Sequence, residues 1–375
     1  MYRRDLFDII GRQLFKGKVI ILFGPRRVGK TTLSKDMLDG ISNSRYLNCE
    51  LLEHKVALET TNSLVLKNYL GDYSLVVLDE AQQIRDIGRT LKVLIDTFPQ
   101  IQIIATGSSS FELGNRLAEP LTGRAREYLL LPLSIAELLQ KEDKLMIRAN
   151  LDQILRFGLY PEVYGKSEEE AKEELNQIAG NYLYRDILQF EQIKRPALLQ
   201  NLLTALALQL GNEVSYNELS RLLGETVPTI QRYVELLEKS FVIFRLRSFS
   251  RNLRKEIGKG QKIYFYDLGI RNALIRNFNQ LQLRNDTGGL WENFCIVERM
   301  KFNTVNRRFV NNYFWRTYDQ KEVDYIEEEG GKLSAFEFKY SSNKQPKLPV
   351  GFLESYPETS FNCVNSENFW SFVSS

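Results

Sequence analysis

Continuous apolar runs separated by polar turns mark the first third of the chain. The clearest are VIILF at 19–23, LVVL at 75–78 and the start of QIIATGSSS at 102–110. Short runs without alternation are typical of strands that are buried on both faces of a parallel sheet. Helix-compatible segments such as TTLSKDML at 31–38 lie between them. The pattern therefore predicts an α/β unit built on a parallel sheet.

The middle of the chain changes to a helical pattern. Residues 135 to about 210 read as helices, and residues 213–249 contain two more helices followed by the alternating run FVIFRLRSF. Ser215 and Glu218 form a capping box that begins the first of these two helices, and Gly224 ends it. Two helices joined by a short glycine turn and followed by a β-ribbon predict a winged helix-turn-helix.

The last third returns to mixed helix and strand patterns. GGLWENFCIVERMKF reads as a helix from about residue 289, and the strands EVDYIEE and LSAFEFKY follow it. The Glu-Gly-Gly turn at 329–331 joins these two strands. The expected division of the chain is into four parts, at 1–137, 138–210, 211–262 and 263–375.

Composition excludes several classes of protein. The chain has 375 residues, a net charge of +3 and three widely separated cysteines, so bulk charge argues neither for nor against a nucleic-acid partner. The three cysteines are too far apart in the sequence to form a cysteine metal-binding motif, and their number and spacing are typical of a protein in a reducing compartment. His54 is the only histidine, which excludes any mechanism that needs two histidines. With no secretory signal and no membrane-length apolar run, we expect a cytoplasmic protein that has no contact with the membrane.

The segment that follows the first apolar run carries the strongest chemical signal. Its skeleton, G-x-x-x-x-G-K-T, is the P-loop pattern. Backbone N–H groups of such a loop wrap a phosphate chain, while Lys30 reaches the β and γ phosphates and the Thr31 hydroxyl holds Mg²⁺. We therefore expect ATP and Mg²⁺ as ligands. The predicted nucleotide-binding residues are Gly24, Pro25, Arg26, Arg27, Val28, Gly29, Lys30, Thr31 and Thr32.

Two further strand ends are expected beside the phosphates. The run that ends in Asp79 and Glu80 would supply a metal-binding carboxylate and a general base for the attacking water. The run that ends near Ser108 would supply a side chain that senses the γ-phosphate, with Thr106 and Ser109 as rivals. Arg124 precedes the last apolar run. It is either an arginine finger, acting within the chain or across a subunit interface, or a surface residue.

Four motifs together resemble a known family. GPRRVGKTTL, VVLDEAQQI, IIATGSSS and LTGRAREYLLLPLS are similar to those of prokaryotic AAA-type ATPases whose C-terminal domain, of unknown function, has been linked to the restriction-endonuclease-like fold. The resemblance implies an α/β fold with a P-loop parallel sheet, a helical segment, a winged helix-turn-helix and a C-terminal restriction-endonuclease-like domain. It also implies nucleotide roles for Lys30, Thr31, Asp79 and Glu80.

Charged residues on the two C-terminal strands show the pattern D-x(n)-E-x-K of the PD-(D/E)XK nucleases. Asp324 lies on the first strand, and Glu337 and Lys339 lie two apart on the second. Two carboxylates would bind Mg²⁺, and the lysine would orient a water or stabilise developing charge. A glutamate from the preceding helix would complete the set, with Glu292 preferred to Glu298. The sequence departs from the strict pattern because valine replaces the proline before Asp324.

A basic cluster follows the two central helices and suggests DNA as a partner. Its members could neutralise several phosphates, although Glu235 and Glu238 on the second helix would oppose this. The predicted DNA-binding residues are Arg232, Arg245, Arg247, Arg251 and Arg254, with Lys255, Lys259 and Lys262 in the same cluster. The alternative is that this region serves as a protein–protein or dimerising module.

These features predict an ATP-hydrolysing protein in which the nucleotide state gates a C-terminal winged-helix and nuclease-like module that acts on DNA. One rival is an active ATP-regulated DNA endonuclease. The other is a nucleotide-controlled adaptor whose nuclease-like core only binds, and which has a protein partner. A homo-oligomer is compatible with each of these interpretations.

Overall fold

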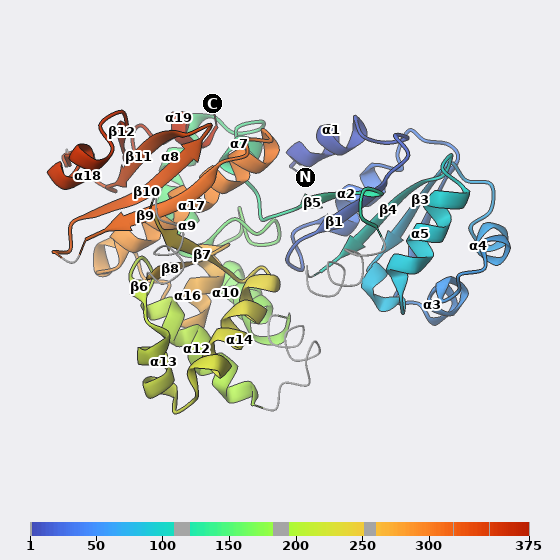
Figure 1. The fold of residues 1–375 in the computed structure, drawn as a ribbon, viewed down its shortest axis with the longest axis horizontal. Helices are drawn as coiled ribbons and strands as arrows, with labels where there is room; N and C mark the ends of the chain where they lie inside the picture. The colour runs from blue at the N-terminus through green and yellow to red at the C-terminus, as the bar shows by residue number, and fades with distance from the viewer. Residues whose placement is uncertain are drawn as a thin grey trace. The chain divides into compact units, whose positions relative to one another are not determined.

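The structure, a computed structural model, describes residues 2–108, 121–182, 195–250, 260–317, 319–344 and 346–374 (Figure 1). The chain divides into two compact units. The first comprises residues 1–132 and the second comprises most of residues 133–375. Among the described residues, no helix has both the length and the apolar character that crossing a membrane requires.

The first unit is built on a five-stranded parallel sheet with the order β2-β3-β4-β1-β5. Strands β1, β3 and β4 are buried along their whole length, which explains why their sequences are continuously apolar. This confirms the prediction of an α/β unit with a parallel sheet. The strands are β1 (Val19–Phe23), β2 (Ser44–Asn48), β3 (Leu75–Asp79), β4 (Gln102–Gly107) and β5 (Ala125–Leu129).

Helices connect the strands from β1 to β4, as parallel pairing requires. Because β4 lies between β1 and β3, the segments that follow these three strands meet at one edge of the sheet. Helix α2 packs against β3 and β4 at this edge. The described helices of the first unit are α1 (Asp5–Gly11), α2 (Lys30–Asp36), α3 (Leu52–Leu58), α4 (Ser63–Leu70), η1 (Ala81–Gln83) and α5 (Ile87–Thr97).

The second unit contains a seven-stranded mixed sheet with the order β12-β11-β10-β9-β7-β8-β6. Strands β7 and β9 pair in parallel, as do β11 and β12, and the remaining pairs are antiparallel. The strands are β6 (Glu213–Val214), β7 (Ile243–Ser248), β8 (Gln261–Phe265), β9 (Asn311–Arg316), β10 (Glu322–Glu329), β11 (Lys332–Phe338) and β12 (Ser360–Val364). The domain boundary expected between residues 262 and 263 therefore lies inside β8.

Long and short helices surround this sheet (Figure 1). The two helices expected before the alternating strand are present, because Ser215 caps α13, Gly224 ends it in a left-handed conformation, and α14 follows. The described helices are α7 (Ile135–Leu138), α8 (Lys144–Ala149), α9 (Leu151–Phe157), α10 (Glu168–Gln177), η2 (Ile178–Tyr182), α12 (Pro196–Leu208), α13 (Tyr216–Leu223), α14 (Val227–Lys239), α16 (Leu268–Leu274), η3 (Leu281–Leu283), α17 (Thr287–Val305), α18 (Val350–Ser355) and α19 (Trp370–Val373).

Candidate nucleotide site and carboxylate site

The loop between β1 and α2 requires glycine at both of its ends. A Cβ on Gly24 would lie 1.9 Å from the carbonyl oxygen of Leu130, so no other residue fits there. Gly29 precedes α2 with φ at 94°, a left-handed conformation that side chains disfavour. Arg27 also has a positive φ, of 62°. The loop therefore takes a strained, tightly turned path of the kind that directs backbone N–H groups toward an anion.

Lys30 lies over this loop. Its side chain is buried, and its Nζ donates hydrogen bonds to the carbonyl oxygens of Gly24 at 2.9 Å and Pro25 at 2.8 Å. Both acceptors are neutral. The ammonium group is therefore placed where it can exchange backbone carbonyls for the more strongly attracting oxygens of a phosphate chain.

Arg4, which precedes α1, holds the outer side of the same loop. Its guanidinium group donates to the carbonyl oxygens of Val28 and Leu131, both at 2.6 Å. The fixed Val28 carbonyl orients the peptide group that contains the Gly29 N–H, because the two ends of a planar peptide point in opposite directions. No motif in the sequence indicates this contact. The other predicted residues of the segment are Arg26, Arg27 and Thr32.

The carboxylate of Asp79, at the carboxyl end of β3, accepts three side-chain hydrogen bonds. Thr31 and Tyr46 donate to Oδ2 at 2.8 and 2.6 Å, and Thr106 donates to Oδ1. The structure thus brings Thr31 and Asp79 together, as their metal-binding roles would require. The hydroxyl of Thr106 donates to Asp79, so it is engaged by this carboxylate and does not point to a γ-phosphate as a sensor would. A hydroxyl and a carboxylate in direct contact beside the loop form a donor pair that fits Mg²⁺.

Tyr46 is a member of this site that sequence reasoning missed. It lies on β2, which pairs with β3, and its hydroxyl reaches Asp79 across the strand. Burial and the hydrogen bond to Asp79 raise the pKa of Tyr46, which keeps the hydroxyl protonated as a donor. Burial likewise raises the pKa of the neighbouring Cys49 to about 12, so this thiol is unreactive.

Glu80, Gln82 and Ser108 form a second group at the same edge. Glu80 has a left-handed conformation, with φ at 53°, and its N–H donates to the hydroxyl of Thr106 at 3.1 Å. The side-chain amide of Gln82 donates to the Glu80 carboxylate and to the Ser108 hydroxyl, the latter at 3.3 Å. Gln82, which was not predicted, therefore connects the expected general base to the expected sensor. The rival Ser109 lies outside the described residues.

Arg124 is engaged at the surface. Its Nε donates to Asp96 on α5 at 2.6 Å, and this hydrogen bond raises the pKa of its guanidinium group. Both side chains are more than a third exposed. The ion pair holds the Arg124 side chain against α5. Among the described hydrogen bonds and ion pairs, none joins Arg124 to the loop residues or to Asp79.

In the second unit, Asp324, Glu337 and Lys339 come together. The register that pairs Tyr325 with Phe336 places Asp324 on β10 opposite Glu337 on β11. Lys339 Nζ lies 2.9 Å from Glu337 Oε2 and 3.4 Å from Asp324 Oδ2. The backbone N–H of residue 338 also donates to Asp324 at 2.9 Å. The two acids and the lysine of the predicted motif therefore form one cluster.

Glu292 and Glu298, the two candidates on α17, have different surroundings. Glu292 Oε1 accepts from Lys262 at 2.8 Å and from the hydroxyl of Tyr264 at 2.5 Å. Glu298 is only 1% exposed and accepts from the N–H of Ile135 at 2.7 Å, so it serves a structural role. The preference for Glu292 agrees with its position near Asp324, whose charge acts on it.

Lys262 requires a correction. It was expected among exposed basic residues, but its side chain is 2% exposed and forms ion pairs with Glu292 and Glu322. In the strand QKIYF, alternation places Lys262 and Tyr264 on the same face, and both reach Glu292. Burial alone would lower the pKa of Lys262, but the carboxylates of Glu292 and Glu322 outweigh it and raise the pKa above the usual lysine value.

Two acids near the lysines, Glu337 and Glu292, have raised pKa values. Burial and the charge of Asp324 raise the pKa of Glu337 to about 7, against the effect of Lys339. Burial raises the pKa of Glu292 to about 7 as well, although Lys262 opposes the shift. Within the described parts of the chain, no three acidic, histidine or cysteine side chains are grouped as a metal-ligand set. Lysines take the places next to the carboxylates, so this cluster does not fit a preformed metal centre.

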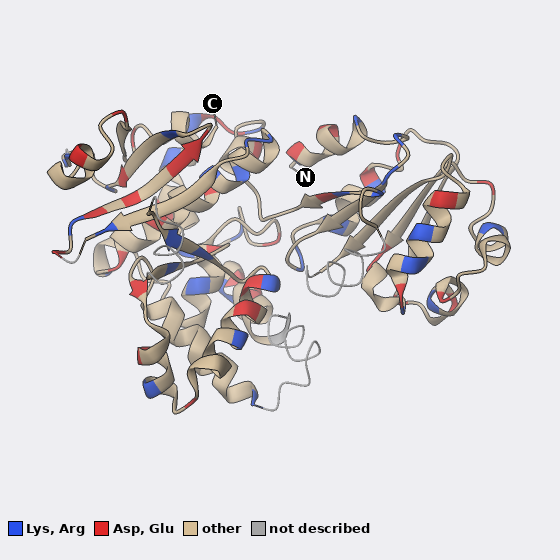
Figure 2. Ribbon diagram, in the orientation of Figure 1, with Lys and Arg blue, Asp and Glu red and all other residues tan. Residues whose placement is uncertain are grey.

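The predicted DNA-binding residues do not form one continuous basic face among the described residues (Figure 2). Arg232 is exposed on α14 and Arg247 is exposed on β7. Arg245 donates to the carboxylate of Glu238, with its Nε at 2.9 Å, so its charge is largely compensated. Arg251 and Arg254 lie outside the described residues, as do Lys255 and Lys259.

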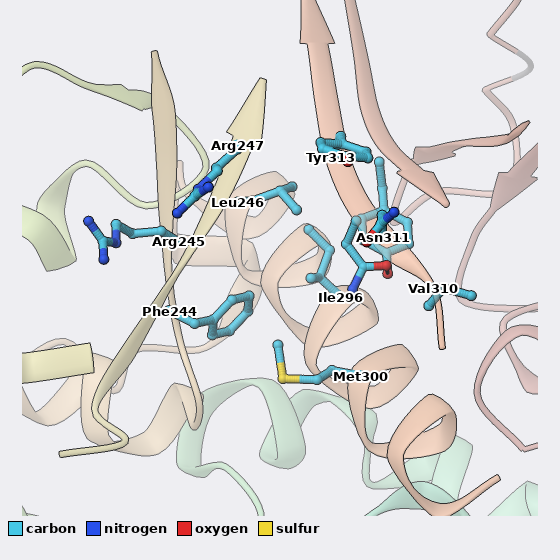
Figure 3. A pocket seen from close by; sticks show the side chains of 11 residues that line it. Phe244, Arg245, Leu246, Arg247, Ile296, Met300, Val310, Asn311 and Tyr313 are labelled. Carbon is cyan, nitrogen blue, oxygen red and sulfur yellow. Dashed lines mark hydrogen bonds between the residues drawn. The ribbon is translucent and has the colours of Figure 1, made fainter. Parts of the chain in front are cut away.

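A cavity of about 320 Å³ opens in the same unit where β7 and β9 separate (Figure 3). The two strands pair only at Arg247 with Tyr313 and at Ser248 with Phe314. Ile296 and Met300 of α17 line the cavity from below the strands. None of the acids in the carboxylate cluster lines it.

Comparison with known families divides the chain into three segments. Residues 16–139 match the AAA domain family. Residues 148–281 and 287–369 match two families that are described only as domains of unknown function, DUF8612 and DUF4143. The first segment covers the P-loop, β3 and β4, so the first unit is similar to AAA-type P-loop ATPase domains.

Relatives extend along nearly the whole chain. An uncharacterized protein of Mycobacterium tuberculosis is 28% identical over 344 residues, which is 91% of this chain and 74% of the relative. An uncharacterized protein of Methanocaldococcus jannaschii is 25% identical over 84% of this chain and 73% of its own length. The solved structure of a Walker-type ATPase of Pyrococcus abyssi is 17% identical and aligns with a TM-score of 0.51, over 73% of this chain and 96% of its own. At this identity the last similarity concerns the fold alone.

Proposed function

We propose that the protein hydrolyses ATP to ADP and phosphate in a Mg²⁺-dependent reaction, and that its nucleotide state controls how the second unit engages DNA. The observation that carries the first part is the contact between Thr31 and Asp79 beside the buried Lys30. The regulatory part rests on the presence, in one chain, of an ATPase domain and a charged cluster of nuclease-like spacing.

Each residue of the nucleotide site has a defined task in this reaction. Lys30 leaves the two loop carbonyls and binds the β and γ phosphates, where it stabilises the charge that develops on the leaving group. Glu80 accepts a proton from the attacking water, and Gln82 holds the Glu80 carboxylate in a fixed orientation. Mg²⁺, when bound, would neutralise phosphate charge, and Thr31 and Asp79 are the residues that would hold it.

Steady-state ATP turnover tests this assignment. Lys30→Ala should lower turnover by about 10²–10³-fold because the charge on the phosphates is left without its ammonium partner. Glu80→Gln should retain nucleotide binding but lose turnover, since the amide cannot accept the proton. Lys92→Ala, an exposed lysine on α5, is the matched control and should behave like the unmodified protein. Undiminished turnover in Lys30→Ala would refute the nucleotide site.

We further propose that the second unit has a restriction-endonuclease-like core preceded by a winged helix, and that it binds DNA through phosphate contacts. Such contacts would involve Arg232 and Arg247, which are exposed, and Lys339, which is 31% exposed beside Asp324 and Glu337. A band-shift titration at several salt concentrations tests this, because neutralised phosphates make affinity fall steeply with salt. Lys339→Ala and Arg247→Ala should each reduce that slope. Absence of DNA binding with and without ATP would favour a protein partner.

An ATP-regulated endonuclease is the second candidate, and the convergence of Asp324, Glu337 and Lys339 favours it. Plasmid DNA incubated with the protein, ATP and either Mg²⁺ or Mn²⁺ provides the assay. Cleavage that disappears in Asp324→Ala and in Glu337→Ala would establish the activity. No cleavage under any nucleotide condition would restrict the cluster to binding.

A further inference from the structure

The carboxylate cluster of the second unit contains an ammonium group that is far more enclosed than Lys339. Lys262 lies on β8, whose neighbours in the sheet are β7 and β6, so its backbone is paired on both sides. Its side chain is 2% exposed. Lys339, in contrast, follows the end of β11 and is 31% exposed. The first lysine is fixed in the sheet, whereas the second has room to move away from its acids.

The ammonium group of Lys262 bridges acids from separate elements. Nζ lies 2.8 Å from Glu292 Oε1 of α17 and forms an ion pair with Glu322 of β10. The hydroxyl of Tyr264 donates to the same oxygen of Glu292 at 2.5 Å. The ring of Phe314 closes another side, with its centroid 5.5 Å from the ammonium nitrogen. Joining carboxylates from a helix and a strand is the task that a divalent cation performs in a carboxylate metal site.

We propose that Lys262 is a built-in cation of the second unit, which holds Glu292 and Glu322 together in place of a divalent metal ion. Glu292 is then unavailable as a metal ligand, and among the described acids around Lys262 and Lys339 the Asp324–Glu337 pair remains to receive an exchangeable divalent cation. A metal ion at Glu292 would have to displace an ammonium group whose side chain is 2% exposed, which leaves that charge uncompensated.

Mn²⁺ titration of the full chain, followed by calorimetry, tests the proposal. All variants carry Asp79→Asn, so that the nucleotide site contributes equally or not at all. With Lys262 present, Glu292→Gln should leave the Mn²⁺ affinity unchanged. Lys262→Met should increase the affinity by about tenfold, because two carboxylates become free, and adding Glu292→Gln to Lys262→Met should cancel that gain. Lys262→Arg keeps the charge and should show no gain.

Two results would overturn the proposal. One is a loss of Mn²⁺ affinity of about tenfold or more in Glu292→Gln while Lys262 is present, because this would make Glu292 a metal ligand. The other is a folded Lys262→Met variant, verified by circular dichroism, that gains no affinity. If Lys262→Met does not fold, the Glu292→Gln comparison decides alone. The titration contains neither DNA nor ATP, so its outcome is separate from that of the DNA-binding proposal, which concerns the same site.

Discussion

Each unit buries a lysine at its candidate site, but the partners of the two ammonium groups differ. Lys30 contacts two neutral carbonyl oxygens of its own loop, whereas Lys262 contacts two carboxylates. Carbonyl partners are weaker than phosphate oxygens, so Lys30 can exchange them for a ligand. Carboxylate partners in a buried place hold Lys262 permanently. The comparison teaches that burial of a lysine does not by itself mark a ligand site, since the charge of its neighbours decides whether it is available.

The largest expected effect contrasts the stability of two variants. Lys262→Met should lower the free energy of unfolding by about 3 kcal/mol, because it leaves the partly buried carboxylates of Glu292 and Glu322 without their cation. Lys30→Ala should lower it by about 1 kcal/mol, since its hydrogen bonds to two neutral carbonyl oxygens are lost. Urea denaturation of both variants measures the difference. Equal destabilisation of the two variants would contradict the proposed difference between the two lysines. Stabilisation of Lys262→Met by Mn²⁺ would support it.

The pH dependence of stability is the next largest effect. Glu337 in the folded chain keeps its proton up to a pKa of about 7, whereas the unfolded chain loses it near the usual glutamate value of 4.5. The folded state therefore binds more protons between these two values, and stability falls as pH rises from 4.5 to 7. We expect a fall on the order of 1 kcal/mol from this group. Denaturation at pH 5 and pH 7.5 should show it in the unmodified protein and a smaller fall in Glu337→Gln.

Tyr46 provides a smaller and more specific test in the first unit. Tyr46→Phe removes one hydroxyl donor from Asp79 and should cost about 1 kcal/mol of stability. It should also raise the Mg²⁺ concentration that gives half-maximal ATP turnover by about tenfold, because a supporting contact of the metal-binding carboxylate is lost. Tyr73→Phe is the control, since the Tyr73 ring lies near Arg45 and not at Asp79. An unchanged Mg²⁺ requirement in Tyr46→Phe would show that Thr31 and Thr106 suffice.

The smallest effect is expected at the surface of the first unit. Arg124→Ala should leave the free energy of unfolding almost unchanged, because its ion pair with Asp96 is exposed to solvent. Asp96→Ala should have the same small effect. Comparing ATP turnover in these two variants distinguishes the two interpretations of Arg124. If ATP turnover falls strongly in Arg124→Ala and not in Asp96→Ala, the arginine acts on the nucleotide, and otherwise it is a surface residue.

Local motifs were predictable from the sequence, and contacts that depend on strand order were not. The P-loop and the acid pair at 79–80 each lie within one short segment that follows an apolar strand. The parallel sheet and the nearness of Thr31 to Asp79 could therefore be inferred from the sequence. Tyr46 and Thr106 reach Asp79 only because β2 and β4 are the two neighbours of β3 in the sheet. No pattern in one sequence specifies that order.

The second unit shows a different reason for failure. Lysine is usually a surface residue, so its type alone predicts exposure. The burial of Lys262 becomes clear only in the structure, where β8 is paired on both sides and the side chain is 2% exposed. The alternation of Lys262 with Tyr264 between apolar residues was a usable signal that one face of the strand is polar and enclosed. The parallel pairing of β7 with β9, which joins the two expected domains in one sheet, connects segments more than sixty residues apart and leaves no local trace.

The continuity of this seven-stranded sheet has a practical consequence for anyone dividing the protein. A cut at residues 262–263 would sever β8 and separate β7 from β9 and from most of β8, so β9 would lose its pairing with β7 in the C-terminal fragment. It also sets a geometric limit on recognition. Arg247 and Asp324 are carried by strands of the same sheet, so the sheet sets the distance between them. A ligand that contacts both residues must be long enough to span that distance.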